Sequence, residues 1–159
     1  MLAADVMSRK VVTLAPSDTL RDACLAFGKA GISGAPVTDA GGRLLGILSE
    51  TDILTHLKRL ADSEVTGRFL TREAHSLAIL ALLGEGAEEA VAELLGHLRT
   101  AMVKEAMSKR VITAAPGSPM AEVVALMVRH DINRVPIVEG GRLVGIVTRA
   151  DVMEYLGKS

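Results

Sequence analysis

The chain contains two copies of one motif, and this duplication constrains its fold more than any other feature. Residues 7–13, Met-Ser-Arg-Lys-Val-Val-Thr, reappear as residues 107–113, Met-Ser-Lys-Arg-Val-Ile-Thr. Residues 41–52 reappear as residues 140–151 at the same spacing, apart from one extra residue in the first copy, Ala40. Such a repeat predicts two similar units that bury their apolar faces by packing together.

Each copy predicts the element order strand, helix, strand, turn, strand, helix. β-Branched residues at 11–14 and 111–113 predict a short first strand. A second strand, a hairpin turn and a third strand are predicted at residues 35–37, 39–42 and 44–48, and again at 135–138, 139–141 and 143–147. Ser49 and Thr148 then open a last helix. The expected fold class is α/β (α+β), with two β-α-β-β-α motifs.

An apolar stripe predicts the first helix of each copy. Asp18 and Ser118 stand where its N-cap is expected, and Gly31 is a stop signal in the first copy. The stripe follows the i, i+3, i+4, i+7 spacing of one helix face, at Leu20, Ala23, Cys24 and Phe27, and at Met120, Val123, Val124 and Met127. Cys24 is therefore expected to be a small core residue.

The segment between the copies predicts a helical insert. One helix is expected from residue 52 to about residue 64, and two more at 71–84 and 87–99. Their apolar faces would be formed by Leu77, Leu80, Ala81, Leu94, Leu95 and Leu98, and their solvated face by Glu85, Glu88, Glu89 and Glu93. The chain is thus divided into motif 1 at 1–54, the insert at 55–103 and motif 2 at 104–159. The insert covers one side of the pair or builds a dimer interface.

Composition excludes several classes of function. The formal net charge is -1 and aromatic residues make up only 2% of the chain, which disfavours nucleic-acid binding by charge or base stacking. The longest apolar run, residues 77–83, is too short to span a bilayer. The single cysteine excludes an internal disulfide and fits the cytoplasm. The high hydrophobic content, 49%, predicts a core and a subunit interface.

The ordered set of motifs resembles the cystathionine β-synthase (CBS) domain. The pattern is Met-Ser-x-x-Val-hydrophobic-Thr, then hydrophobic-Pro-hydrophobic, then Gly-hydrophobic-hydrophobic-Ser/Thr-x-x-Asp, and it covers residues 5–54 and 104–153. Two copies resemble a tandem CBS pair, or Bateman module. The resemblance implies a pseudo-twofold pair of motifs, a nucleotide-responsive regulatory role and a disc-shaped homodimer. The long insert departs from the family, whose linkers are usually shorter.

The resemblance also implies two ligand clefts for AMP, ADP, ATP or S-adenosylmethionine. Cleft A would be formed by Thr13, Asn133, Arg134, Thr148 and Asp151. Cleft B would be formed by Thr113, Ser33, Ser49 and Asp52. In the family, the aspartate binds ribose hydroxyls, the Ser or Thr three residues earlier binds ribose or phosphate, and the first-strand Thr lines the adenine pocket.

Elementary chemistry fits these roles and predicts unequal clefts. A carboxylate is a natural acceptor for two ribose hydroxyls, and the free N–H groups of a helix N-terminus favour a phosphate. Arg134 adds a charge-assisted donor for phosphate oxygens, whereas the matching residue of the first copy is Gly34. We therefore expect cleft A to bind phosphorylated adenosine better than cleft B does.

A purely structural interpretation of the same residues remains open. Ser49-x-x-Asp52 and Thr148-x-x-Asp151 also fit a helix capping box, and capping and ligand binding are compatible. Thr13 and Thr113 also fit ordinary strand positions, and Arg134 also fits a surface cation. These alternatives keep an assembly module with non-binding clefts as a rival.

The favoured prediction is a non-catalytic cytoplasmic module that binds an adenosine-containing ligand and signals to a partner protein. No cofactor, nucleic acid or membrane insertion is expected. No nucleophile–base set or paired acids are apparent, and the histidines share no metal-ligand spacing, at His56, His75, His97 and His130. An enzyme and a metalloprotein are accordingly disfavoured.

Overall fold

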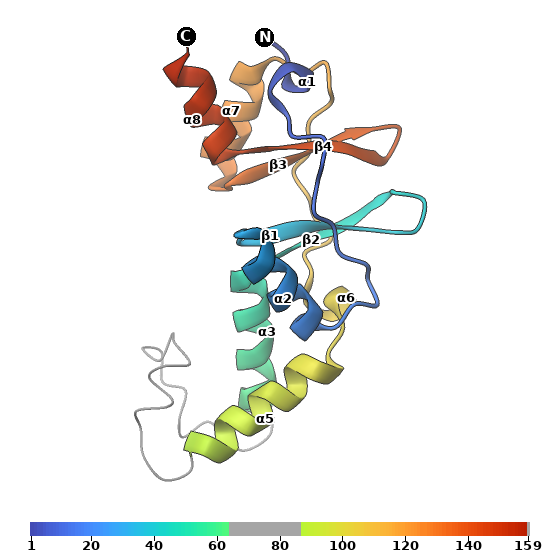
Figure 1. The fold of residues 1–159 in the computed structure, drawn as a ribbon, viewed down its shortest axis with the longest axis vertical. Helices are drawn as coiled ribbons and strands as arrows, with labels where there is room; N and C mark the ends of the chain where they lie inside the picture. Colours follow the sequence, from blue (N-terminus) through green and yellow to red (C-terminus); the bar gives the residue numbers. More distant parts are fainter. Residues whose placement is uncertain (64–86, 159) are drawn as a thin grey trace. The chain divides into compact units, whose positions relative to one another are not determined.

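The computed structural model describes residues 1–63 and 87–158, and the elements given below belong to these two ranges (Figure 1). The chain forms two compact units. Unit 1 contains residues 1–16, 35–47 and 108–159, and unit 2 contains residues 17–34 and 48–107. Each unit therefore combines segments from both copies of the repeat.

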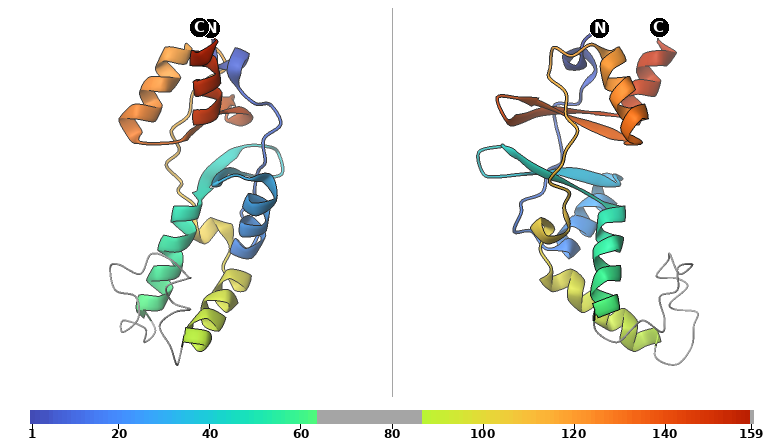
Figure 2. Two further views of the ribbon diagram at one scale, coloured as in Figure 1. Left: turned by 60° about the vertical axis from the view of Figure 1, so that its left-hand side comes forward. Right: turned by 180° about the vertical axis from the view of Figure 1, so that it is seen from behind.

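Two antiparallel hairpins and three helices make up most of unit 1. The elements are α1 (Ala3–Val6), β1 (Gly34–Thr38), β2 (Leu44–Ser49), α7 (Met120–His130), β3 (Arg134–Glu139), β4 (Arg142–Thr148) and α8 (Arg149–Gly157). Strand β1 pairs with β2, and β3 pairs with β4. Helix α7 contacts β3 and α8 contacts β4, and both helices lie on the same side of that hairpin (Figures 1 and 2). The second and third strands of each copy are thereby confirmed.

The core of unit 1 lies between these helices and the β3–β4 hairpin. Its buried members are Ala3, Met7, Ala114, Met120, Val123, Met127, Val135, Ile137, Val147 and Val152. Three of them, Met120, Val123 and Met127, form the predicted stripe of α7. The α7 stripe is therefore confirmed at its buried positions, and the strands supply its partners.

Two short helices were not predicted, and each lies at the start of the other copy's first helix. In unit 1, the backbone N–H of Ala3 in α1 donates to the carbonyl of Ser118 at 2.8 Å. In unit 2, the N–H of Val103 in α6 (Val103–Ala106) donates to the carbonyl of Asp18, also at 2.8 Å. This exchange of segments explains why each unit contains parts of both copies.

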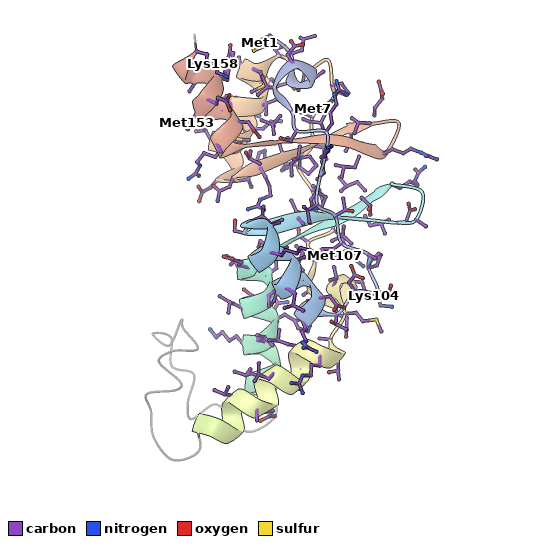
Figure 3. All side chains as sticks on the ribbon, in the orientation of Figure 1. Met1, Met7, Lys104, Met107, Met153 and Lys158 are labelled. Atoms are coloured by element: carbon purple, nitrogen blue, oxygen red, sulfur yellow. The ribbon has the colours of Figure 1, made fainter. Side chains whose placement is uncertain are left out.

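The repeated Met-Ser pair has a structural role after these short helices. Ser8 exchanges two backbone hydrogen bonds with Ile146 of β4, at 2.9 and 3.0 Å. Ser108 exchanges two with Ile47 of β2, both at 2.9 Å. Met7, which precedes Ser8, is buried beside β4 (Figure 3). The motif therefore adds one bridged residue to the edge of the other copy's hairpin.

The predicted first strands at 11–14 and 111–113 are wrong as full strands. The structure has one parallel bridge in each copy instead, Leu14 with Val37 and, one residue after the second predicted range, Ala114 with Ile137. The chain leaves β4 at Ser8 and reaches β1 at Leu14, so it crosses from one hairpin to the other. Because it follows neither edge, it cannot build a ladder.

Unit 2 is built mainly from helices α2 (Leu20–Ala30), α3 (Glu50–Ser63) and α5 (Ala87–Thr100). Helix α5 contacts both α2 and α3, and α3 contacts α6. The helices predicted from residue 52 and at 87–99 are confirmed. The helix predicted at 71–84 lies outside the described residues, as do Leu77, Leu80, Ala81 and Glu85, and the side chains of Glu88 and Glu89 are also outside the description.

Burial within α5 corrects part of its predicted apolar face. Leu94 is buried and Leu98 is partly buried, whereas Leu95 is 46% exposed. Glu93 is exposed, as predicted. Leu95 therefore does not belong to the packed face of α5.

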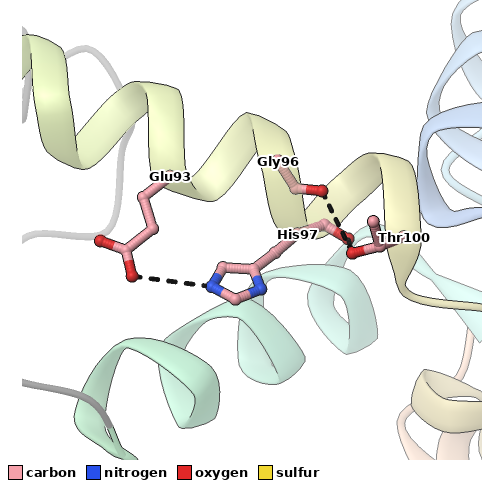
Figure 4. A network of polar contacts seen from close by, with 4 residues as sticks. All are labelled: Glu93, Gly96, His97 and Thr100. Atoms are coloured by element: carbon pink, nitrogen blue, oxygen red, sulfur yellow. Dashed lines mark hydrogen bonds and ion pairs between the residues drawn. The ribbon is translucent and has the colours of Figure 1, made fainter.

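Side-chain contacts mark the last turns of α5 (Figure 4). The Thr100 hydroxyl donates to the carbonyls of Gly96 and His97, at 3.2 and 3.4 Å. Glu93 Oε1 lies 3.8 Å from His97 Nε2, one turn along the helix. The hydroxyl thus adds a side-chain donor to carbonyls in the last turn of the helix; the His97 carbonyl also accepts the backbone N–H of Ala101 at 2.8 Å.

The ends of α2 and α7 differ from the predicted caps. The N-cap of α2 is Thr19 rather than Asp18, because the Thr19 hydroxyl accepts the N–H of Asp22 at 3.1 Å. The N-cap of α7 is Pro119 rather than Ser118, and it makes no side-chain cap. The predicted stop at Gly31 is confirmed by its left-handed φ of 64°.

Cys24 is not a core residue, contrary to prediction. Its side chain is exposed on α2, while Leu20, Ala23 and Phe27 form the buried face. Residual desolvation, with a smaller contribution from the Glu50 carboxylate, raises the pKa of the Cys24 thiol. The i+4 position therefore lies at the edge of the stripe rather than inside it.

Candidate ligand-binding site

The N-terminus of α8 is closed by a reciprocal pair of side chains, Thr148 and Asp151. Asp151 Oδ2 accepts the backbone N–H and the hydroxyl of Thr148, both at 2.7 Å. The Thr148 hydroxyl accepts the N–H of Asp151 at 3.3 Å. The capping interpretation of these two residues is therefore confirmed. A carboxylate has about four acceptor positions on its two oxygens, so the cap leaves acceptor capacity for a ligand.

The first copy has the same pair at the start of α3. Asp52 Oδ2 accepts the Ser49 N–H at 2.9 Å and the Ser49 hydroxyl at 3.0 Å. The Ser49 hydroxyl accepts the Asp52 N–H at 3.2 Å. All four side chains are partly buried. The sequence repeat is therefore also a repeat of geometry.

Strand register brings Asn133 and Arg134 to the cap of α8. Arg134 is directly opposite Thr148 in the antiparallel ladder of β3 and β4. The N–H of Arg149, the first residue of α8, donates to the carbonyl of Asn133 at 2.9 Å. Opposed residues of an antiparallel pair project to the same face of the sheet. Four of the five residues predicted for cleft A are thus brought together within unit 1.

The equivalent place in the first copy has the same backbone but fewer charges. The N–H of Glu50 donates to the carbonyl of Ser33 at 3.0 Å, which brings Ser33 to Ser49 and Asp52. The residue after Ser33 is Gly34, which is buried in β1 and has no side chain to offer a ligand. The difference between Arg134 and Gly34 therefore falls at the helix N-terminus of each copy.

The two threonines predicted for the adenine pockets are not joined to these clusters. Thr13 is exposed beside Leu14, whose N–H donates to the carbonyl of Pro36 in β1 at 3.0 Å. Among the described contacts, none links Thr13 to the residues around Thr148. Thr113 is exposed in unit 1, whereas the other residues of cleft B belong to unit 2. The roles of both threonines remain predictions.

A cavity of about 260 Å³ that was not predicted from the sequence lies between α1 and α8. It is lined by Met1, Asp5, Val6, Asp151, Glu154, Tyr155 and Lys158. A signal was present, because Asp151, Glu154, Tyr155 and Lys158 follow the i, i+3, i+4, i+7 spacing of one helix face. The hydrogen bond and charge of Lys158 lower the pKa of Glu154. Asp151 therefore belongs to both the cap and the wall of this cavity.

Residues 1–63 and 87–158 contain no set of three or more His, Cys, Asp or Glu side chains arranged to hold a metal ion. None of their helices combines the length and apolarity that a bilayer crossing requires.

The duplicated hairpin-and-helix fold, with a capped Ser/Thr-x-x-Asp step in each copy, defines the class of protein. The CBS domain family matches residues 3–59 and 103–158. The chain belongs to the CBS domain family, as a tandem pair with mixed α+β structure.

Similar proteins extend over nearly the whole chain. The uncharacterized protein MJ1426 of Methanocaldococcus jannaschii is 34% identical over 157 residues, which cover 98% of this chain and 91% of that protein. Other curated relatives are longer, and the chain spans between 13% and 42% of their lengths. The pair therefore resembles a portion of larger proteins as well as one protein of similar size.

Two solved structures share the fold. The CBS domain pair of protein MJ0100, in complex with 5′-methylthioadenosine and S-adenosyl-L-methionine, gives a TM-score of 0.66 at 23% identity, with 99% of this chain and 97% of that chain covered. CBSX2 in complex with AMP gives a TM-score of 0.69 at 19% identity, with 99% and 96% covered. At these identities the likeness concerns the fold.

Proposed function

We propose that this chain is a non-catalytic regulatory module that binds an adenosine-containing small molecule and signals its presence to a partner protein. The binding residues are those of cleft A, Asn133, Arg134, Thr148 and Asp151, with Thr13 against the adenine. AMP, ADP, ATP and S-adenosylmethionine are the candidate ligands, and no resident cofactor is required. The second cleft, with Thr113, Ser33, Ser49 and Asp52, binds more weakly or takes a less charged ligand.

One observation carries this proposal, namely that Arg134 is opposite Thr148 beside the start of α8. A guanidinium and the N-terminus of a nine-residue helix both favour a phosphate. The Asp151 carboxylate, three residues further on, accepts hydroxyl hydrogens and suits the 2′ and 3′ hydroxyls of ribose. An adenosine phosphate requires hydrogen-bond donors for its phosphate oxygens and a hydrogen-bond acceptor for its ribose hydroxyls. This site offers both in one place.

The fold comparisons support the same ligand class. MJ0100 is solved with two adenosyl compounds and CBSX2 with AMP, so three ligands that share adenosine occur on this fold. An adenine in this chain would rest on aliphatic side chains, since only 2% of residues are aromatic. Val12, next to Thr13, is 41% exposed and supplies such a surface.

We further propose that the module acts as a homodimer in the cytoplasm. Large apolar side chains remain exposed on five of the described helices, at Leu25 in α2, Leu54 in α3, Leu95 in α5, Val128 in α7, and Met153 and Leu156 in α8. Val128 is 78% exposed, so most of its apolar side chain is available for burial against another chain. Motif 1 at 1–54, the insert at 55–103 and motif 2 at 104–159 remain our division of the chain by role.

A structural assembly module is the second candidate. Both aspartates already serve the fold, because each is bonded to its N-cap residue. Their occurrence is therefore explained without a ligand. This candidate predicts dimerisation without any response to nucleotides.

A matched pair of variants separates the two candidates. Asp151→Ala and Asp52→Ala each remove the same capping contact, so each should lower stability by about 1 kcal/mol. Thermal-shift screening against AMP, ADP, ATP, NAD, S-adenosylmethionine and GTP, confirmed by calorimetry, should show selective binding of an adenosyl ligand. We expect Asp151→Ala to abolish that binding and Asp52→Ala to retain it. No shift with any of these compounds, in protein free of bound nucleotide, would favour the assembly module.

A further inference from the structure

Two arginines face each other where the hairpins of the two copies meet. The Leu44 N–H donates to the carbonyl of Gly141 at 3.1 Å, and the Leu143 N–H donates to the carbonyl of Gly42 at 3.0 Å. These reciprocal bonds flank Arg43 and Arg142, which form an isolated antiparallel bridge. Arg43 and Arg142 are therefore a non-hydrogen-bonded pair, the type in which opposed side chains come closest.

The Arg43 head group extends toward the second hairpin turn. A Cβ atom placed on Gly141 would lie 3.2 Å from Arg43 Nη2 and 3.5 Å from its Cζ. Gly141 has a φ of 80°, so a glycine is favoured at this turn, and the missing side chain leaves room for the guanidinium. The glycine turn thus places the Arg43 guanidinium over the chain segment that immediately precedes Arg142.

Like charges directly opposed on two strands destabilise the pair unless something neutralises them. Both arginines are exposed, and no carboxylate of residues 1–63 or 87–158 forms an ion pair with either of them. Two carboxylates are nearby in the hairpins. Asp39 Oδ1 accepts the backbone N–H groups of Gly41 and Arg43, both at 2.9 Å, which commits it to its own turn.

The second carboxylate, Glu139, is opposite Arg142 in the β3–β4 ladder and is exposed. Glu139 and Arg142 belong to the same hairpin, β3–β4, whereas Arg43 approaches Arg142 from the β1–β2 hairpin. Asp39 and Glu139 therefore flank the two arginines, but neither forms an ion pair with them among the described residues. The guanidinium N–H groups of Arg43 and Arg142 are thus not bonded to these carboxylates.

We propose that Arg43 and Arg142 form a binding site for a small phosphate-class oxyanion, such as pyrophosphate or a phosphate monoester. Guanidinium groups present donors in a planar fork that matches such oxygens, and the strand pairing holds the two arginine backbones opposite each other. The site is separate from the proposed adenosine site. Arg142 and Thr148 are the two ends of β4, about 20 Å apart at the rise of a strand. Its occupation does not depend on ligand binding at Asp151.

Calorimetric titration of the full chain with pyrophosphate at low ionic strength tests this site. We expect saturable binding that Arg43→Gln/Arg142→Gln weakens at least about tenfold, in line with the loss of charge-assisted hydrogen bonds. Arg129→Gln, which removes an exposed arginine from α7, should leave it unchanged. Glu139→Gln should tighten it. Absence of binding or equal loss in Arg129→Gln would overturn the proposal, as would duplex DNA binding at these arginines without pyrophosphate binding.

A second measurement tests the repulsion itself. In the ligand-free protein, Arg43→Gln should raise Tm at low salt, and the difference should disappear at high salt, where charges are screened. A lower Tm for Arg43→Gln at low salt would mean that the two guanidinium groups do not repel, and the proposed site would not exist.

Discussion

Met7 covers Gly145 so closely that no side chain fits between them. A Cβ atom placed on Gly145 would lie 2.4 Å from Met7 Sδ, 2.8 Å from its Cγ and 3.2 Å from its Cβ. Met7 is 8% exposed, and the next residue, Ser8, is bonded to Ile146 of β4. The Met-Ser motif and the strand glycine, far apart in sequence, are therefore two halves of one packing contact.

Gly145→Ala should destabilise the protein by about 1–3 kcal/mol, because the crowding atoms include the inner part of the Met7 side chain and the backbone is fixed by Ser8. Urea unfolding measures the change. Gly28→Ala is the control, since nothing lies within 4 Å of its added Cβ within α2, and it should raise stability by about 0.5–1 kcal/mol. Equal effects of the two substitutions would contradict the contact.

The two copies of the repeat end their first helices with different residues in the same backbone conformation. Gly31 has a φ of 64° and Asp131 has a φ of 50°, both left-handed. Gly31→Ala should lower the free energy of unfolding by about 1 kcal/mol, whereas Asp131→Gly should raise it by a smaller amount. Chemical denaturation of both variants measures this. Changes of the same sign would show that the left-handed cap does not control stability here.

Local pattern and chain order explain which parts of the fold the sequence predicted. The hairpins and their following helices depend on neighbours within a few residues, and Ser49 and Thr148 were correctly placed at helix starts. The prediction of the first strands was wrong because Ser8 and Leu14 pair with different hairpins. This pairing is long-range, and a run of β-branched residues does not reveal it. The short helices α1 and α6 were not predicted for the same reason, because the position of each depends on contacts with the other copy.

The candidate site was predictable to the same extent. Thr148, Asp151 and Arg134 belong to a local strand–helix junction, and the register that opposes Arg134 to Thr148 follows from a short hairpin. The α1–α8 cavity depends on packing of the chain's beginning against its last helix. The sequence shows only the helical spacing of the residues on α8 that line this cavity.

Acid should remove one specific contribution to stability. Hydrogen bonds from the backbone N–H and the side chain of Thr19 hold the pKa of Asp22 below its ordinary value of 3.8, against an opposing desolvation, and the charge of Arg21 adds a smaller lowering effect. A lowered pKa in the folded state means that the contribution is present at neutral pH and is lost as pH falls through that pKa. Asp22→Asn should therefore be less stable than the parent at pH 7 and equal to it in strong acid.

The pH series should use urea midpoints from pH 7 to pH 2. Glu122→Gln in α7 is the matched control, because its N-cap, Pro119, has no N–H for the carboxylate to accept. Glu122→Gln removes a first-turn carboxylate from a helix of the same length without removing a hydrogen bond to the N-cap. If the urea midpoint of Asp22→Asn differs from that of the parent by the same amount at pH 2 as at pH 7, the carboxylate charge is not the cause of the difference.

Arg134→Gly converts the second copy to the residue of the first and tests the predicted inequality of the clefts. Because a hydrogen bond to a charged group contributes about 1.5–3 kcal/mol, AMP binding should weaken by about 10–100-fold. Adenosine has no phosphate for the guanidinium to contact, so its Kd should change by less than about threefold. Since glycine also loosens a strand, Arg134→Gln is measured alongside and should give the same discrimination without that effect. Calorimetry with both ligands on both variants decides the matter, because equal losses for AMP and adenosine would mean that Arg134 does not face the phosphate.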